Sequence, residues 1–99
     1  MFENTRYVTQ GISAEIPGYL QNLLWYLIET MEIQEKDYLQ VFTLTSIWED
    51  GELKQSVLHS QERPAYRKEY RIRANLPVTA KIFVIDDGSH TTMLLSEEY

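Results

Sequence analysis

The sequence predicts an α+β fold in which one main helix packs on a mostly antiparallel sheet of five to six short strands. Residues 16–31 have the apolar periodicity of an amphipathic helix. Two Asp-Gly pairs each separate two runs that are rich in β-forming residues. With 99 residues, 43% of them hydrophobic and 24% charged, the chain is expected to form a single globular domain over residues 1–99.

Residues 6–10 are typical of a short first strand, which Gly11 ends. The helix is expected to begin between Ile16 and Tyr19. Pro17 suits the first helical turn because its missing N–H would be unpaired there anyway, whereas Pro-Gly could form a turn and delay the start. At 100° per residue, the apolar side chains that should face the sheet fall in one sector of roughly 100°: Ile16, Leu20, Leu23, Leu24, Leu27 and Met31.

Trp25 does not belong to that sector, because it falls about 145° from its centre, in the middle of the polar face. Burying a large aromatic side chain contributes ~2–3 kcal/mol, so exposure of Trp25 would be costly. Three interpretations follow: an ordinary isolated surface aromatic, a side chain covered by the chain's own ends, or one covered by a partner. Trp25 is therefore a candidate interface residue.

The best local signal is Asp50-Gly51, which lies between two β-rich runs and favours a two-residue type I′ turn. Such a loop fixes the register, so Glu49 should face Glu52, and Phe42 should face His59. The opposite face is led by polar side chains. The face on which the helix should pack collects Phe42, Leu44, Trp48, Leu53 and Val57.

Pro64 interrupts the pattern and predicts a bend, after which residues 67–74 alternate again. Lys68, Tyr70, Ile72 and Ala74 share one face of this strand. The outer face is rich in guanidinium groups and carries Arg67, Glu69, Arg71 and Arg73.

Asp87-Gly88 predicts a second hairpin, and a two-residue loop there would pair Val84 with Thr91 and Ile82 with Met93. Both faces of this hairpin are apolar, and one helix cannot cover both faces of a sheet. The second face therefore needs a curled sheet, a loop or a second subunit as its cover. Its candidate interface residues are Phe83, Ile85 and Leu94.

Composition excludes several classes of function. The chain has no cysteine, so disulfides, thiol catalysis and cysteine-bound metals are excluded. No apolar run approaches the ~20 residues of a membrane span, and the first ten residues lack the regions of a signal peptide. We therefore expect a cytoplasmic protein without membrane association. The net charge of −6 argues mildly against a general nucleic-acid binder.

Charge is distributed unevenly along the chain. Residues 63–81 hold six of the nine basic side chains and one acidic side chain, so this segment has a net charge of +5 and the rest of the chain −11. Arginine clusters match the geometry of phosphate and carboxylate groups. We call the arginine-rich segment at residues 63–73 the basic stripe. It is either a solvated surface that pairs with the chain's own acids, a site for an acidic protein, or, less favoured, a nucleic-acid site. Its candidate binding residues are Arg63, Tyr66, Arg67, Arg71 and Arg73.

No constellation of residues indicates catalysis. His59 should lie beside Phe42 at the end of an apolar face, where a hydrogen-bonding role is commoner than that of a base. His90 follows a turn, where small polar residues serve geometry. Residues 86–89 lack the further acids of a calcium loop, and no nucleophile elbow or phosphate-binding glycine motif is present. We predict no catalytic residue, no metal site and no cofactor.

Several stretches resemble a family of small uncharacterised proteins of Gram-positive bacteria, catalogued as domain of unknown function 960. They are Arg6-Tyr7, the LLW of residues 23–25, DYLQVF at 37–42, QERPAY at 61–66 and the ending IDDGSHTTMLLSEEY. The resemblance covers nearly all 99 residues and implies one intact bacterial cytoplasmic domain. It implies no activity, because the family has none assigned.

The function expected from the sequence is that of a non-enzymatic interaction or accessory protein, with a homodimer or another protein as the partner. The alternative is a nucleic-acid-associated protein that uses the basic stripe at residues 63–73. An enzyme that uses His59 ranks behind both.

Overall fold

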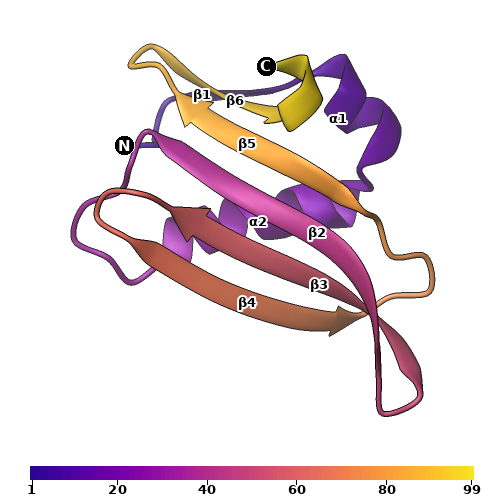
Figure 1. The fold of residues 1–99 in the computed structure, drawn as a ribbon. Coiled ribbons are helices and arrows are strands. Elements are labelled where there is room, and N and C mark those ends of the chain that lie inside the picture. The colour runs from indigo at the N-terminus through magenta and orange to yellow at the C-terminus, as the bar shows by residue number, and fades with distance from the viewer.

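The computed structural model describes all 99 residues and confirms the α+β prediction. Figure 1 shows one curved sheet with the main helix across one face. The strand order is β1-β6-β5-β2-β3-β4, in which only the β1–β6 pair is parallel. The elements are β1 (Thr5–Val8), α1 (Gln10–Glu15), α2 (Gly18–Thr30), β2 (Leu39–Glu49), β3 (Glu52–Gln61), β4 (Tyr66–Arg73), β5 (Ala80–Asp86), β6 (His90–Leu95) and the 3₁₀ turn η1 (Ser96–Glu98).

The main helix α2 begins directly after Pro17, within the range expected from the sequence. Its buried side chains, Leu20, Leu24, Leu27 and Ile28, pack on the sheet. Three of them were predicted for the core. Ile28 was not, because its position on the helical wheel borders the predicted sector.

The first strand was predicted to run to Gln10, which is wrong: the strand ends at Val8 and α1 begins at Gln10. The physical reason is Thr9, whose hydroxyl accepts a hydrogen bond from the Ile12 amide at 3.3 Å and caps the helix. Ile12 is then fully buried in the core. Figure 1 shows α1 beyond the edge of the sheet that β1 and β6 form.

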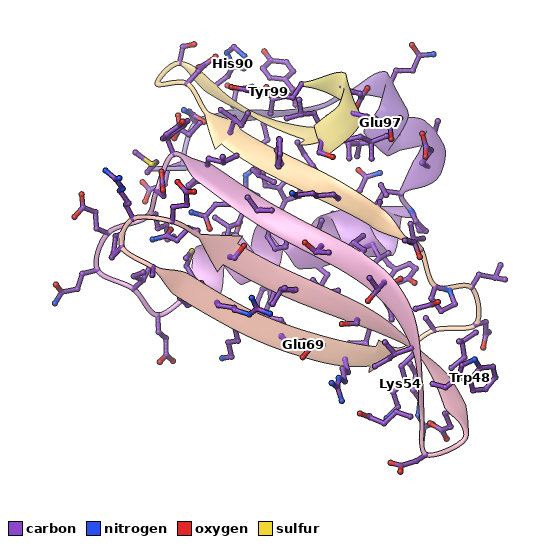
Figure 2. All side chains as sticks on the ribbon, viewed as in Figure 1. Trp48, Lys54, Glu69, His90, Glu97 and Tyr99 are labelled. Carbon is purple, nitrogen blue, oxygen red and sulfur yellow. The ribbon has the colours of Figure 1, made fainter.

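The β2–β3 hairpin has the predicted register, with Glu49 opposite Glu52 and Phe42 opposite His59. Asp50 and Gly51 have φ angles of 54° and 76°, and both positions require positive φ in a type I′ turn. The prediction for Trp48 is wrong, because its side chain is 75% exposed. Figure 2 shows Trp48 near the tip of the hairpin, which extends past α2.

The predicted register of the last hairpin is also wrong, by two residues. The structure pairs Val84 with Met93, and the two loop residues are Gly88 and Ser89. Gly88 has a φ of 98°, as the first position of a type II′ turn requires. The Asp87 carboxylate accepts hydrogen bonds from the backbone amides of His90 and Ser89, each at 3.0 Å. These bonds lower the pKa of Asp87 to about 2. A shift of two residues leaves every side chain on its predicted face.

Glu98 joins the last turn of the chain to the first helix. Its carboxylate accepts hydrogen bonds from the Thr9 hydroxyl at 2.7 Å, the Leu95 amide at 2.8 Å and the Gly11 amide at 3.2 Å. These bonds lower the pKa of Glu98. A Cβ at position 11 would lie 2.7 Å from this carboxylate, which explains a glycine there.

We expect Glu98→Ala to lower the Tm and to speed hydrogen exchange at the Gly11 and Leu95 amides, because both donors lose their acceptor. Thermal unfolding and amide exchange by NMR measure the two effects. Glu97→Ala is the matched control, since the Glu97 carboxylate makes no hydrogen bond or ion pair. Equal changes in the two variants would contradict a specific role for Glu98.

Candidate functional site

The face of the sheet opposite α2 has no covering layer of helices (Figure 1). We call it the open face. Strand pairing brings apolar side chains of β2, β5 and β6 together on it, because Leu39 pairs with Ile85, and Val41 pairs with Phe83, which pairs in turn with Leu94. On the neighbouring strand β3, Leu58 lies on the same face, opposite Thr43. These residues are half-buried, apart from Leu94, which is 9% exposed. We define the apolar patch as Leu39, Val41, Leu58, Phe83, Ile85 and Leu94.

Exposed tyrosines border the patch. The Tyr99 ring meets Phe83 edge-on at 5.8 Å between ring centroids, and Tyr7 meets His90 at 5.2 Å. Figure 2 shows His90 and Tyr99 at the side of the sheet that β6 forms. Aromatic rings at the border of an apolar surface are typical of protein interfaces, because they combine a large contact area with a polar end.

The cavities of the molecule are small or shallow. Next to Leu39 and Val41 lies a cavity of about 110 Å³, far below the ~300–1,000 Å³ of small-molecule sites. The larger hollows, of about 340 to 400 Å³, are depressions lined by five or six residues each. The open face is therefore broad, and the one cavity beside the apolar side chains of β2 is small.

The basic stripe lies at one side of the open face, where β4 presents Arg67, Glu69, Arg71 and Arg73 as the alternation predicted. Arg71 pairs with Glu49 and, at 3.6 Å, with Glu69, while Arg73 lies 3.6 Å from Glu52. Hydrogen bonds from Lys54 and Arg71 lower the pKa of Glu49. Arg67 makes no ion pair with a carboxylate.

The other two candidate residues of the stripe lie apart from these arginines. The Arg63 amide donates to the Asp37 carboxylate at 3.2 Å, in the turn between β3 and β4. Tyr66 lies on the helix-facing side of β4, with its ring 5.3 Å from that of His59. Burial is the main cause that raises the pKa of Tyr66. The structure thus places three arginines on the open face of β4, Arg63 in the preceding turn and Tyr66 on the other face, where it lines a hollow together with Arg67.

Trp25 is covered from within the chain. The Arg6 guanidinium of β1 lies 4.7 Å from the centre of the indole ring, and Glu29 binds the same guanidinium at 2.6 Å. The indole is half-buried and packs against the core. Trp25 therefore lies on the helix side of the sheet, apart from Phe83, Ile85 and Leu94.

His59 is fully buried and belongs to a network of amide side chains. Its Nε2 donates to Gln40 Oε1 at 2.7 Å, since the Gln40 amide nitrogen already donates to Gln61 Oε1 and to the Asp37 carbonyl. Nδ1 has no partner. Burial, helped by the charge of Lys36, lowers the pKa of His59 to about 4. The ring is neutral at pH 7 and lines none of the cavities.

His90 serves the turn in which it lies, with Nδ1 3.1 Å from the Ser89 hydroxyl and Nε2 3.3 Å from the Asp87 carboxylate. No group of three or more His, Asp or Glu side chains converges in a way that could hold a metal ion. None of the helices has the length and apolar character that crossing a membrane requires.

Sequence reasoning missed three residues of the patch: Leu39, Val41 and Leu58. The predicted β2–β3 register already placed Val41 and Leu58 on the face opposite Phe42, so alternation was a sufficient signal for these two. Joining them to Phe83 required the pairing of β2 with β5, which connects two separate hairpins. No short-range pattern encodes that pairing.

Comparison with known proteins places this geometry in a family. A crystal structure of a protein of unknown function from Enterococcus faecalis is similar to the chain, with 25% sequence identity and a TM-score of 0.71. The match covers 98% of this chain and 92% of that one. No curated protein matches. The family model described as "Staphylococcal protein of unknown function (DUF960)" matches residues 5–98, and the chain therefore belongs to the DUF960 family.

Proposed function

We propose that this protein is a non-enzymatic interaction protein whose docking surface is the open face of the sheet. One observation carries the proposal: the apolar patch runs across four neighbouring strands, and beyond η1 and the Tyr99 ring at its β5–β6 end it has no second layer above it. Contiguous apolar surfaces with a polar border mark interaction sites on monomeric proteins, because leaving them in water is costly.

The absence of a built reaction site in the described structure favours this class of function over catalysis. The only fully buried histidine is neutral, bonded to an amide and enclosed by the Phe42 and Tyr66 rings. The cavity beside the patch has room for no more than a side chain of a partner. A side chain inserted there would act as an anchor at the edge of a broad contact.

A protein partner is favoured over nucleic acid because of the charges on the open face. A nucleic-acid groove presents unpaired cations along the backbone, together with aromatic rings on which bases stack. Here Arg71 and Arg73 have carboxylate partners, and Glu69 interrupts the stripe. The centre of the face is mostly apolar, with Lys81 over the Phe83 ring, and this composition suits protein side chains better than a row of phosphate groups.

Site-specific photo-crosslinking in the bacterial cell tests the proposal. A photoreactive amino acid at Ile85, inside the patch, is expected to form protein adducts of discrete mass. The matched control carries the same amino acid at Tyr26, an exposed residue of α2 outside the open face. Val41→Lys in the Ile85 variant should abolish the adducts, because it places a charge in the contact.

Two outcomes would overturn the proposal. The first is that no protein adduct forms from the patch, or that Tyr26 gives the same adducts as Ile85. The second is that the adducts consist of nucleic acid, with an affinity that falls steeply as salt is added.

A further inference from the structure

We infer that the outer edge of β4 binds an extended segment of another protein, which joins the sheet as an additional strand antiparallel to β4. The segment carries an acidic residue opposite Arg67 and apolar residues opposite Tyr70 and Ile72. This edge lies beside the open face and is a contact surface separate from it. Three features support the inference: the unpaired backbone of β4, the regularity of the strand, and the side chains that it presents.

The backbone of β4 has a partner on one side only, because β4 is the last strand in the order of the sheet. In an antiparallel ladder, alternate residues direct their N–H and C=O groups away from the neighbouring strand. Neither a side chain nor a loop forms a hydrogen bond with the backbone of β4. Figure 1 shows no helix or strand alongside its outer edge. These groups are therefore available to an added strand, and an antiparallel one continues the pattern of β2, β3 and β4.

β4 lacks most of the devices by which proteins block an open edge. Its eight residues pair with β3 without a bulge and contain no proline. The other edge strand, β1, has only four residues and offers about half as many backbone groups. Charge is the device that β4 retains, since four of its residues are basic and one is acidic. Like charges opposite one another destabilise a strand pair, so this edge selects against basic strands and for a strand with an acidic side chain.

The cation that lacks a partner on the open face of β4 is Arg67. Arg71 pairs with Glu49, and Arg73 lies 3.6 Å from Glu52, so the second half of the strand already has carboxylate partners. Arg67 is exposed and makes no ion pair. An acidic side chain directly opposite it on an added strand would lie within reach of the guanidinium group.

The helix side of the same end of β4 is closer to neutral. Lys68 makes no ion pair and lies 5.4 Å from the centre of the Tyr70 ring. Two acids are near this end, Glu62 in the turn before β4 and Glu32, whose charge acts on the Tyr66 hydroxyl. The partner's acidic residue is therefore assigned to the open face, opposite Arg67, and a neutral polar residue to the position opposite Lys68.

The second half of β4 presents apolar surface on the helix side. Tyr70 and Ile72 are half-buried and pack against the core, which leaves part of each side chain in water. Apolar side chains opposite them on an added strand would extend the core by one strand. Opposite positions run in reverse order in an antiparallel pair, so these apolar residues stand five and three positions before the acidic residue.

Neither a second copy of β4 nor a nucleic acid supplies this pattern. Two β4 strands paired over their full length about a two-fold axis would set Arg67 opposite Arg73. They would also set Glu69 opposite Arg71, which already has two carboxylate partners. A nucleic acid would meet the cations but leave the outer C=O groups and the apolar side chains without partners.

NMR titration of the isotope-labelled full chain with a synthetic peptide tests the inference. The peptide is acetyl-Thr-Val-Thr-Phe-Thr-Gln-Glu-Thr-amide, in which Glu is placed opposite Arg67, Phe opposite Tyr70 and Val opposite Ile72. We expect alternate amides of β4 to become protected from hydrogen exchange, because only every second N–H points outward. N-methylation along the peptide should raise the Kd by more than about 10-fold at every second position and by less than about threefold between them.

Charge exchange tests the contact with Arg67. Arg67→Glu should raise the Kd for this peptide by about 10-fold, because two acids then lie opposite one another. A peptide with Lys in place of its Glu should bind the Arg67→Glu protein about 10-fold more tightly than it binds wild type. Lys81→Glu makes the same change of charge on the open face of β5, away from β4, and should change the Kd by less than about threefold. Circular dichroism verifies that both variants are folded.

The edge contact and the docking surface fail in distinguishable ways. If the peptide shifts the resonances of Phe83 and Ile85 and leaves the β4 amides unprotected, or if Lys81→Glu weakens binding as much as Arg67→Glu does, the edge inference is overturned and the open face stands. Absence of binding, or effects of N-methylation without the alternation, would also overturn it. Missing adducts at Ile85 in the cell would overturn the docking surface and leave protection of β4 by the peptide unaffected.

Two further results would name another occupant of the edge and overturn the inference. The first is protection of the β4 amides that rises with protein concentration in the absence of peptide, which is the behaviour of a second copy. The second is tighter binding of a thymidine oligonucleotide than of the peptide at the same salt concentration.

Discussion

Replacing Phe42 with alanine is expected to lower the free energy of unfolding by about 3–5 kcal/mol. The Phe42 side chain is 0% exposed, lies on a central strand and stacks on the His59 ring with 4.4 Å between the centroids. Its removal leaves a cavity that the packed α2 side chains cannot close completely. Because the total stability of such a domain is about 5–15 kcal/mol, a large part of it would be lost. Urea denaturation followed by circular dichroism measures the difference.

Phe83→Ala is the matched control, because it removes the same ring from the other face of the same sheet. The Phe83 ring is half-buried in the monomer, so we expect a loss of about 1 kcal/mol. Equal losses in the two variants would contradict a core on only one side of the sheet.

The free energy of unfolding should also fall by up to about 3 kcal/mol between pH 6.5 and pH 4 because of His59. Burial holds the pKa of His59 at about 4 in the folded protein, whereas the unfolded chain titrates near 6.5. Between these values the unfolded state binds more protons, so stability decreases as the pH falls and changes no further for this group below about pH 4. Urea denaturation at a series of pH values measures the curve.

His59→Gln isolates this contribution. The glutamine amide can still donate to Gln40 Oε1, but it does not titrate. Asp86, Asp87 and Glu98, whose pKa values are lowered by hydrogen bonds, titrate in both proteins and cancel in the comparison. Parallel stability curves for wild type and His59→Gln between pH 6.5 and 4 would contradict the prediction.

Local signals in the sequence were sufficient for the β2–β3 hairpin, because two independent patterns agree there. Asp50-Gly51 requires a two-residue turn, and the alternation of apolar side chains is consistent with the register that this turn imposes. In the last hairpin, Asp87-Gly88 predicts the same type of turn, but the Asp87 side chain binds the following amides and moves the loop to Gly88-Ser89. The Gly88-Ser89 pair also suits a two-residue loop, with Gly at the first position of a type II′ turn, so turn propensity alone left the register open.

Long-range contacts set the parts of the fold that the sequence did not reveal. The six-residue helix α1 depends on Thr9 and on the carboxylate of Glu98, which is far away in the chain. The parallel pairing of β1 with β6 has no local signature. The position of Trp25 on the polar side of the helix was visible, but its cover by Arg6 depends on where β1 lies.

In the candidate site, too, local patterns predicted some features and long-range strand pairing determined the others. Alternation placed Phe83, Ile85 and Leu94 on a second apolar face, and the structure has them there. The extent of the patch could not be derived, because it depends on the order in which the hairpins join. The carboxylate partners of Arg71 and Arg73 include Glu49 and Glu52, which β2 and β3 bring alongside β4. Their positions follow from strand pairing and not from any motif.

The parallel pairing of β1 with β6 constrains how the molecule is made. On the ribosome, β1 emerges before every other strand of this sheet, yet its partner β6 is synthesised after all the others. The β2–β3–β4 meander can form early, because its strands are neighbours in the chain. Pairing of β1 with β6 is slower, because it must close the long loop between them. Until β6 is synthesised, the side chains of β1 have no partner strand. The same holds for Phe2, which precedes β1 and is buried in the folded protein. Assembly of this fold should therefore be completed only after synthesis of its last strand.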